Sequence, residues 1–296
     1  MLLLLTSSGD GTSDILARGL KNRLFRLNFD HLPDYKGYLT PDSWEFINAV
    51  GHSISSQVAK TTMIWKPFFD TNQIYDKLIA DEAKYVFREL YSWFIENGKI
   101  KGNPLDFHNK YGKIRILGKA QKYFRIPRTI FTVSLHNQEY IDKSARITKT
   151  LSSSLTSDGK ALFTTDISNK NLDRKFPWLI QEKISSDCDV TCFVVGDEKF
   201  LFQRDRRSLV GLDWRAEQSF DIDKEEWVFE PITNFERDQL ESLNSDLGVS
   251  WGRYDFMRDP DGSLVFLEFN ANGQWVFLDY HNKHGLVDAV LKYLEN

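Results

Sequence analysis

Several features are scarce in this chain of 296 residues, and each scarcity excludes a class of protein. Only two cysteines are present, Cys188 and Cys192, so a disulfide-stapled scaffold is excluded and a thiol-reducing cytoplasm is expected. Eight prolines and 17 glycines are too few for collagen-like repeats or long linkers. No stretch approaches the roughly 18 apolar residues of a membrane span, and the apolar start lacks the basic residues of a signal peptide. We therefore expect no membrane partner.

An excess of basic residues is also missing. The chain has 38 Lys and Arg against 42 Asp and Glu, which leaves a net charge of −4. Proteins that bind nucleic acid normally carry a basic excess to neutralise phosphates, so we expect no nucleic-acid partner. What is present is an ordinary globular composition, with 41% hydrophobic and 27% charged residues. The length corresponds to two domains at about 150 residues each.

The order of segments along the chain predicts a mixed α+β protein. Residues 2–5 and 24–27 have strand character around a helical segment at 15–20, which is typical of a βαβ unit. An amphipathic helix is expected over 82–95, and Asn97-Gly98 ends it, so a boundary is placed near 97–103. Further expected elements are a helix at 111–123, strands at 146–151, 161–165 and 178–184, a hairpin of 189–195 with 199–203, and a helix at 236–247.

The most informative stretch is a predicted hairpin around the turn Asp259-Pro-Asp-Gly262. If Arg258 faces Ser263, then Asp255 faces Phe266. Because side chains alternate along a strand, one face then carries Arg253, Asp255, Met257, Phe266, Glu268 and Asn270. The opposite face carries Tyr254, Phe256, Val265, Leu267 and Phe269.

This register makes Asp255 and Glu268 diagonal neighbours, with Cβ atoms about 7–8 Å apart. Two carboxylates at that range repel each other unless a cation lies between them. A hard divalent ion prefers carboxylate and amide oxygens, so Asp255, Glu268 and Asn270 suit Mg²⁺. The alternative is that Arg253 pairs with both acids on a solvent-facing strand, and the spacing leaves both interpretations open.

Residues 266–275, Phe-Leu-Glu-Phe-Asn-Ala-Asn-Gly-Gln-Trp, preceded by Asp255, resemble the C-terminal metal motif of ATP-grasp ligases. The continuation Gly273-Gln274-Trp275 is similar to the branch that matures ribosomally made peptides, the microviridin-type or graspetide macrocyclases. Other features follow in the same order over about residues 2–294. The resemblance implies an ATP-grasp fold with an N-terminal α/β pre-ATP-grasp domain. Its expected divisions are 1–96 for that domain, 97–184 for the central subdomain and 185–296 for the C-terminal catalytic subdomain.

The resemblance also implies a nucleotide site. Lys113 and Lys149 take the places of the two lysines that contact ATP phosphates, although Lys110 and Lys119 are nearby alternatives to Lys113. Asp189 lies where an acidic residue takes the ribose hydroxyls, although the family's next cationic position is Thr191 here. The remaining implied ligands are Gln181, Glu182, Lys183 and Ile184 at the adenine, with Asp255, Glu268 and Asn270 at Mg²⁺.

Two further features are implied beside the nucleotide. The Ser-rich segment 152–165 resembles the loop that covers the phosphates, and its polar content predicts that it is mobile without nucleotide. Arg215, in Asp213-Trp-Arg215, resembles the arginine that faces the reacting carboxylate, and a guanidinium can hold a carboxylate with two parallel bonds. Arg253 is the next candidate for that role.

The chemistry implied by the resemblance begins with phosphorylation of a carboxylate by ATP. The acylphosphate is then attacked by a hydroxyl or amine, which forms ester or amide cross-links in a precursor peptide. Expected partners are the leader and core segments of that peptide and a second copy of the chain in a homodimer. Two alternatives remain: another ATP-grasp carboxylate–amine ligase, and a nucleotide-binding module without catalysis.

Overall fold

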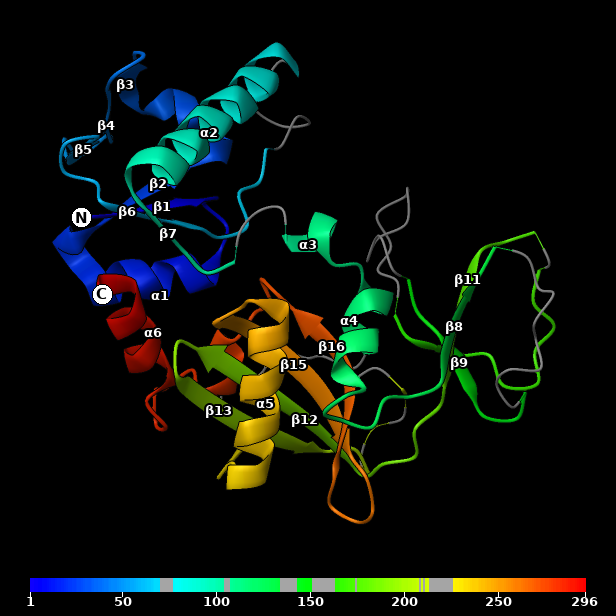
Figure 1. Ribbon diagram of the computed structural model, residues 1–296. Helices are drawn as coiled ribbons and strands as arrows, with labels where there is room; N and C mark the ends of the chain where they lie inside the picture. The colour runs from blue at the N-terminus through cyan, green and yellow to red at the C-terminus, as the bar shows by residue number, and fades with distance from the viewer. Residues whose placement is uncertain are drawn as a thin grey trace. The chain divides into compact units, whose positions relative to one another are not determined.

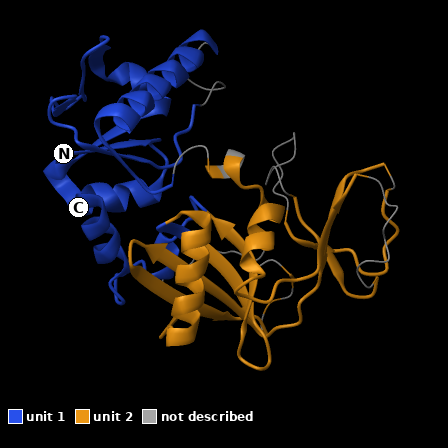
Figure 2. Ribbon diagram, in the orientation of Figure 1, with its two compact units in different colours: residues 1–105, 250–252, 271–296 blue, residues 106–249, 253–270 orange. Residues whose placement is uncertain are grey.

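The computed structural model describes residues 1–69, 77–103, 107–133, 143–150, 163–173, 175–207, 209, 211–212 and 226–296. The chain forms two compact units, coloured separately in Figure 2. Unit 1 comprises Met1–Leu105, Ser250–Gly252 and Ala271–Asn296, and unit 2 comprises Asp106–Val249 and Arg253–Asn270. These bounds differ from the three divisions expected from the resemblance, and that division stays a prediction. No helix in the described ranges is long and apolar enough to cross a membrane.

Unit 1 is built on a parallel sheet in the order β2-β1-β6-β7, shown in Figure 1. Strand β1 pairs in parallel with both β2 and β6, and α1 connects β1 to β2, so the predicted βαβ unit is confirmed. The five residues of β1 are fully or almost fully buried, which explains its unbroken apolar run. The elements are β1 (Leu2–Thr6), α1 (Gly11–Leu20), η1 (Lys21–Arg23), β2 (Leu24–Asn28), β6 (Thr61–Ile64), α2 (Lys77–Asn97), β7 (Lys99–Lys101) and α6 (Leu286–Glu295).

A smaller antiparallel sheet, β3-β4-β5, also belongs to unit 1. Its central strand alternates buried Trp44 and Phe46 with half-buried residues, and these rings pack with Phe94 of α2 and Phe25 of β2 in one core. The elements are η2 (Phe29–Asp34), β3 (Lys36–Leu39), β4 (Trp44–Ile47) and β5 (Ser53–Ser55).

The Gly273-Gln274-Trp275 motif lies in unit 1, in the segment that leads to η5 (Val276–Leu278). Gln274 Nε2 donates to Asp10 Oδ2 at 3.1 Å, and Thr12 Oγ1 donates to Gln274 Oε1 at 2.6 Å. The indole of Trp275 is fully buried and meets Trp251 edge to face. Gln274 and Trp275 therefore bind the C-terminal segment to the start of α1 and to the core of unit 1.

Unit 2 contains a five-stranded sheet in the order β14-β13-β12-β15-β16, with α4 and α5 among its helices (Figure 1). Helix α5 begins with a reciprocal cap between Thr233 and Glu236 and ends at Gly248, whose φ of +68° favours glycine. The elements are α3 (Phe107–Lys110), α4 (Lys113–Ala120), β12 (Cys188–Val195), β13 (Glu198–Asp205), β14 (Val228–Glu230), α5 (Asn234–Leu247), β15 (Trp251–Arg258) and β16 (Leu264–Asn270).

A second sheet of unit 2 has the order β10-β9-β11-β8, and its neighbouring strands are antiparallel. A small core of Ile167 and Ile180 lies against it. The elements are β8 (Thr129–Thr132), β9 (Arg146–Thr148), β10 (Thr165–Asp166) and β11 (Trp178–Glu182). Most of the predicted phosphate-covering segment 152–165, residues 152–162, lies outside the described residues.

The hairpin β15–β16 forms as predicted, but the predicted register is wrong. Asp259 accepts from Gly262 N within a tight turn, and Gly262 has a φ of +88°, so Arg258 pairs with Leu264 rather than with Ser263. Leu267 is then an extra residue between two ladder pairs, a β-bulge. As a result Asp255 lies directly opposite Glu268 instead of opposite Phe266, and Phe266 pairs with Phe256.

Candidate functional site

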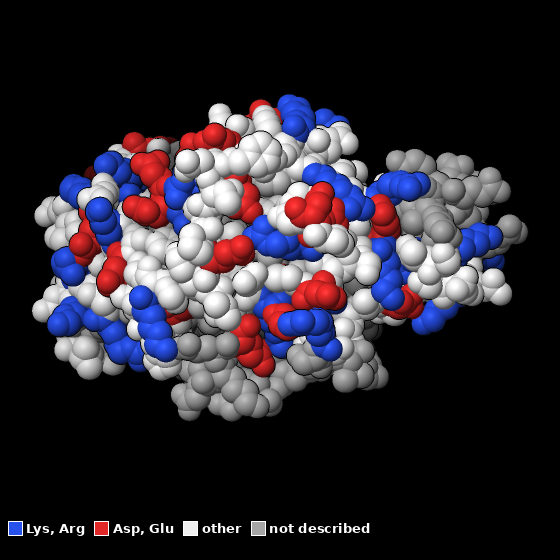
Figure 3. Space-filling view, turned by 90° about the horizontal axis from the view of Figure 1, so that it is seen from below, with Lys and Arg blue, Asp and Glu red and all other residues white. Residues whose placement is uncertain are grey.

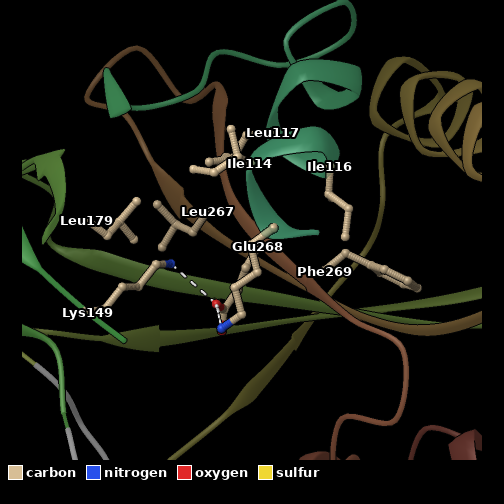
Figure 4. Close-up of a pocket in the computed structure, with 9 residues that line it drawn as sticks. Ile114, Ile116, Leu117, Lys149, Leu179, Leu267, Glu268 and Phe269 are labelled. Atoms are coloured by element: carbon tan, nitrogen blue, oxygen red, sulfur yellow. Dashed lines mark hydrogen bonds and ion pairs between the residues drawn. The ribbon is translucent and has the colours of Figure 1, made fainter. Parts of the chain in front are cut away.

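Two lysines from separate elements meet the same carboxylate in unit 2. Lys113 is the first residue of α4, and its Nζ lies 3.5 Å from Glu268 Oε2. Lys149 follows β9, and its Nζ donates to the same oxygen at 3.3 Å, as Figure 4 shows. The two alternatives to Lys113 are directed elsewhere. Lys110, the last residue of α3, has its Nζ over the Tyr111 ring, and Lys119 of α4 donates to the carbonyl of Asp246 and lies over the same ring. The structure therefore places Lys113, and not Lys119, at the acid pair, which we define as Asp255 and Glu268.

Arginine, threonine and amide groups surround the second carboxylate. Arg253 donates to Asp255 through Nε and Nη2, each at 3.0 Å. Thr191 Oγ1 donates to Asp255 Oδ1 at 3.0 Å. Asn270 Nδ2 lies between the acids and donates to Asp255 Oδ2 at 2.7 Å and to Glu268 Oε1 at 3.2 Å. Arg253 therefore pairs with Asp255, and the two lysines pair with Glu268. The alternative in which Arg253 pairs with both acids is wrong.

The electrostatics of this cluster favour the ionised form of Glu268. Burial alone would raise the pKa of Glu268, but the charges of Lys149 and Lys113, with the Asn270 hydrogen bond, outweigh burial and hold that pKa well below its usual range. Three cationic side chains thus face two carboxylates. On the described part of the face in Figure 3, basic and acidic side chains are interspersed.

An apolar wall stands beside the charged groups. Leu267 and Leu179 line the same pocket as Lys149 and Glu268, together with Ile114 and Leu117 from α4 (Figure 4). The sequence pattern placed Leu267 on the opposite face from Glu268, and this was wrong because the bulge interrupts the alternation there. The pocket therefore combines a charged end, at Lys149 and Glu268, with an aliphatic end.

Asp189 lies near this cluster at the start of β12. Its Oδ1 accepts from Arg206 Nη1 at 2.6 Å, and its Oδ2 is buried without a hydrogen-bond partner among the described residues. Burial raises the pKa of Asp189, and the attraction of Arg206 only partly offsets that rise. Sequence reasoning missed Arg206. The basic run from Arg204 to Arg207, directly after a predicted strand, was the available signal.

The four expected adenine-contacting residues lie on β11 or just after it. Gln181 is buried and donates through Nε2 to Thr129 Oγ1 at 2.9 Å. Glu182 accepts from the backbone N–H of Arg128 at 3.0 Å, and Lys183 pairs with Asp166 at 2.7 Å. Ile184 is half-buried after the strand. Among the lining residues of the pocket, β11 is represented by Leu179 and not by these four.

Arg215, expected to face the reacting carboxylate, lies outside the described residues. Within the described ranges, no three His, Cys, Asp or Glu side chains come together as a metal cluster. The expected Mg²⁺ ligands, the opposed carboxylates of Asp255 and Glu268 and the amide of Asn270, do lie together. Carboxylate and amide oxygens are the donors that Mg²⁺ prefers, so these residues fit the ion chemically.

No family model matches the sequence, and no curated protein matches it. Solved structures do match the fold. One is the macrocyclase MdnC of Microcystis aeruginosa MRC, bound with the precursor peptide MdnA. It is 18% identical with a TM-score of 0.81, and the match covers 100% of this chain and 99% of that one.

Two further structures are similar over nearly the same length. The RiPP-associated ATP-grasp ligase of Chryseobacterium gregarium, in complex with ADP and a leader and core peptide, is 18% identical with a TM-score of 0.81, covering 99% of this chain and 96% of that one. The ATP-grasp ligase PsnB, complexed with a minimal precursor, Mg and ADP, is 16% identical with a TM-score of 0.64, covering 99% and 97%. The chain therefore has the ATP-grasp fold that these proteins share, as the sequence predicted.

Proposed function

We propose that this protein is an ATP-dependent carboxylate ligase that forms ester or amide cross-links between side chains of a ribosomally made precursor peptide. The observation that carries the proposal is the meeting of Lys113, Lys149 and Glu268 with Asp255 on an ATP-grasp fold. Two similar structures support the proposal: MdnC is bound with a precursor peptide, and the Chryseobacterium gregarium ligase is in complex with ADP and a leader and core peptide.

In this proposal the charged end of the pocket takes the phosphates of ATP. Lys113 and Lys149 supply compact positive charges to phosphate oxygens. Asp255, Glu268 and Asn270 hold Mg²⁺, which neutralises and orients the β- and γ-phosphates when bound. The aliphatic end, with Leu179 and Leu267, contacts the base, and Gln181, Glu182, Lys183 and Ile184 are the proposed polar and backbone contacts of the adenine. Asp189 is the proposed partner of the ribose hydroxyls.

The acceptor carboxylate of the peptide needs a cationic partner, because it must approach an anionic phosphate group. Arg215 is the proposed partner, and Arg253 lies beside Asp255 with its guanidinium already fixed. A positioned arginine lowers the repulsion between the two anions and holds the carboxylate oxygen toward the γ-phosphorus. Catalysis then rests on positioning and on charge rather than on a covalent bond to the protein.

Other features of the proposal concern partners and location. The acceptors are Asp or Glu side chains of the core segment, and the donors are Thr or Ser hydroxyls or Lys amines, with the leader segment providing recognition. A homodimer and a location in the cytoplasm stay predictions.

The test is incubation of the purified protein with ATP, Mg²⁺ and a candidate peptide that carries repeated Thr and Glu or Asp. Each ring removes one water, so the peptide mass should fall by whole waters while ADP accumulates. A gain in peptide mass would instead indicate addition of an amino acid, the activity of another carboxylate–amine ligase. If ATP is never consumed with any peptide, the non-catalytic alternative holds.

A matched pair of variants strengthens this test. Glu268→Gln removes a charge at the acid pair and should stop the loss of water. Lys122→Met removes a cation whose partner is Asp246, at 2.8 Å, and should leave the reaction unchanged. If both variants fail equally, the loss reflects general damage and not the site.

A further inference from the structure

Every oxygen of the acid pair already accepts from the protein. Asp255 Oδ1 accepts from Thr191 and Arg253, and Asp255 Oδ2 accepts from Arg253 and Asn270. Glu268 Oε1 accepts from Asn270, and Glu268 Oε2 faces both Lys149 and Lys113. A cation that binds these oxygens must therefore compete with donors that are held on five different elements or their ends.

The charge balance opposes a free divalent cation. Lys113, Lys149 and Arg253 carry three positive charges against the two negative charges of Asp255 and Glu268. The Glu268 side chain is 20% exposed and that of Lys149 16%, so water screens this repulsion only partly. A cation entering alone meets a cluster that is already positive.

Phosphate groups change this balance because they offer the lysines another anionic partner. Lys113 is on a helix and Lys149 is on the segment after a strand, so each side chain can turn from Glu268 without disturbing the hairpin. The Lys113 side chain is 38% exposed, which leaves it room to turn. When the lysines bind phosphate, the Glu268 carboxylate is released for the cation.

We propose that Glu268 takes the place of the nucleotide's phosphates as partner of Lys113 and Lys149 in the nucleotide-free protein, so that the site accepts its divalent cation only together with a nucleotide. The proposal rests on the proposed function and adds an order of binding to it. The two lysines thereby act as counter-ions in one state and as phosphate ligands in the other.

The first test measures binding of Mn²⁺, as a paramagnetic probe for Mg²⁺, to the full-length protein by electron paramagnetic resonance. Without nucleotide the wild type should leave Mn²⁺ free, and with ADP it should bind one Mn²⁺ at least about tenfold more tightly. One Mn²⁺ bound equally well with and without ADP would overturn the proposal.

The second test removes the counter-ions. Lys113→Met with Lys149→Met should bind Mn²⁺ without nucleotide at least about tenfold more tightly than the wild type, because a neighbouring like charge costs a site about that much or more. The control Lys122→Met breaks an ion pair with Asp246 and should bind Mn²⁺ as the wild type does. If the double variant, shown by circular dichroism to be folded, gains no affinity, the proposal is wrong. Should it not fold, the single Lys149→Met variant is measured with the same criterion.

The third test works in the opposite direction and does not depend on a metal. Glu268→Gln should bind ADP in the presence of EDTA several-fold more tightly than the wild type, because both lysines lose the carboxylate that competes with phosphate. An unchanged or weaker affinity would contradict the competition. Failure of the proposed function looks different, because ADP and Mn²⁺ would then bind as described while the candidate peptide loses no water.

Discussion

The two faces of the hairpin β15–β16 are made by the same strands and have opposite character. On one face Tyr254, Phe256, Phe266 and Phe269 are at most 3% exposed, and their rings pack against one another. On the other, Arg253, Asp255, Glu268 and Asn270 are half-buried and form a network of charges and hydrogen bonds. Adjacent residues of each strand thus alternate between an aromatic packing face and a charged face.

This difference explains how two opposed carboxylates are tolerated in one strand pair. Like charges directly opposite each other on a sheet are destabilising. The pairing of the acids with Lys113, Lys149 and Arg253 offsets that cost, and burial of the four aromatic side chains on the reverse face contributes on the order of 1.5–3 kcal/mol each to the hairpin. The comparison implies that variants of the aromatic face change stability, whereas variants of the charged face change binding and turnover.

The largest expected effect is on the aromatic face. Phe256→Ala removes a ring that is 1% exposed and contacts Phe124 and Phe266. It should lower the free energy of unfolding by about 3–5 kcal/mol, measured by urea denaturation. A loss below about 1 kcal/mol would show that this face does not support the hairpin.

The second effect belongs to the charged face and falls mainly on turnover, with a smaller loss of stability because the fold lowers the pKa of Glu268. Glu268→Gln keeps the shape of the side chain but removes the charge that faces both lysines and that we propose as a ligand of the cation. Turnover of ATP with peptide should fall about 100- to 1000-fold, a loss of roughly 3–4 kcal/mol of transition-state stabilisation. The assay is ADP release beside a thermal unfolding curve. Turnover near that of the wild type would remove Glu268 from the site.

A smaller effect is expected for Arg253→Lys, which keeps the charge and loses the two-bond geometry on Asp255. Turnover should fall about tenfold because a lysine cannot hold the carboxylate in one orientation. The matched change Arg207→Lys affects an exposed arginine on Asp205 and should have no effect on turnover. Equal losses in the two variants would contradict a special role for Arg253.

The sequence predicted the hairpin and the common face of the two acids, because the register is shifted by two residues at the acids and a period of two survives that shift. It wrongly placed Phe266 on the face of the acids, because nearer the turn the register is shifted by only one residue. It did not predict that Asp255 and Glu268 are directly opposed. That depends on the tightness of the turn at Gly262 and on the bulge at Leu267, and both follow from packing across the sheet rather than from the local pattern.

The two lysines show a second limit of prediction from the sequence. Neither Lys113 nor Lys149 is distinguished by its neighbours in the sequence, and only the resemblance to ATP-grasp ligases selected them. Their meeting at one oxygen of Glu268 joins residues more than 100 positions apart, which no local pattern encodes. Arg206 was missed for a different reason, because its partner Asp189 lies across a predicted hairpin but the arginines after that hairpin were not considered.

The smallest effect tests a site away from the acids. Glu236 caps α5 and pairs with Arg258 at 3.1 Å; burial would raise its pKa, but the bonds from Thr233 and Arg258 outweigh burial and lower it. A carboxyl with a lowered pKa stabilises the fold above its unfolded pKa of about 4.3 and loses this contribution as the pH falls through the folded pKa. Glu236→Gln should therefore cost about 1 kcal/mol at pH 7, and the difference from the wild type should shrink in acid.

Urea titrations of both proteins at neutral pH and in mild acid check this prediction. A difference that stays constant with pH would mean that the Glu236 charge contributes nothing and that only its hydrogen bonds matter.

The most direct measurement follows a heavy oxygen isotope placed in the acceptor carboxylates of the peptide. If the charged face of the hairpin positions ATP for attack by a carboxylate, each ring that forms transfers one labelled oxygen to inorganic phosphate, read by mass spectrometry. Labelled phosphate is expected in step with the water lost from the peptide. Cyclised peptide with unlabelled phosphate would contradict the account.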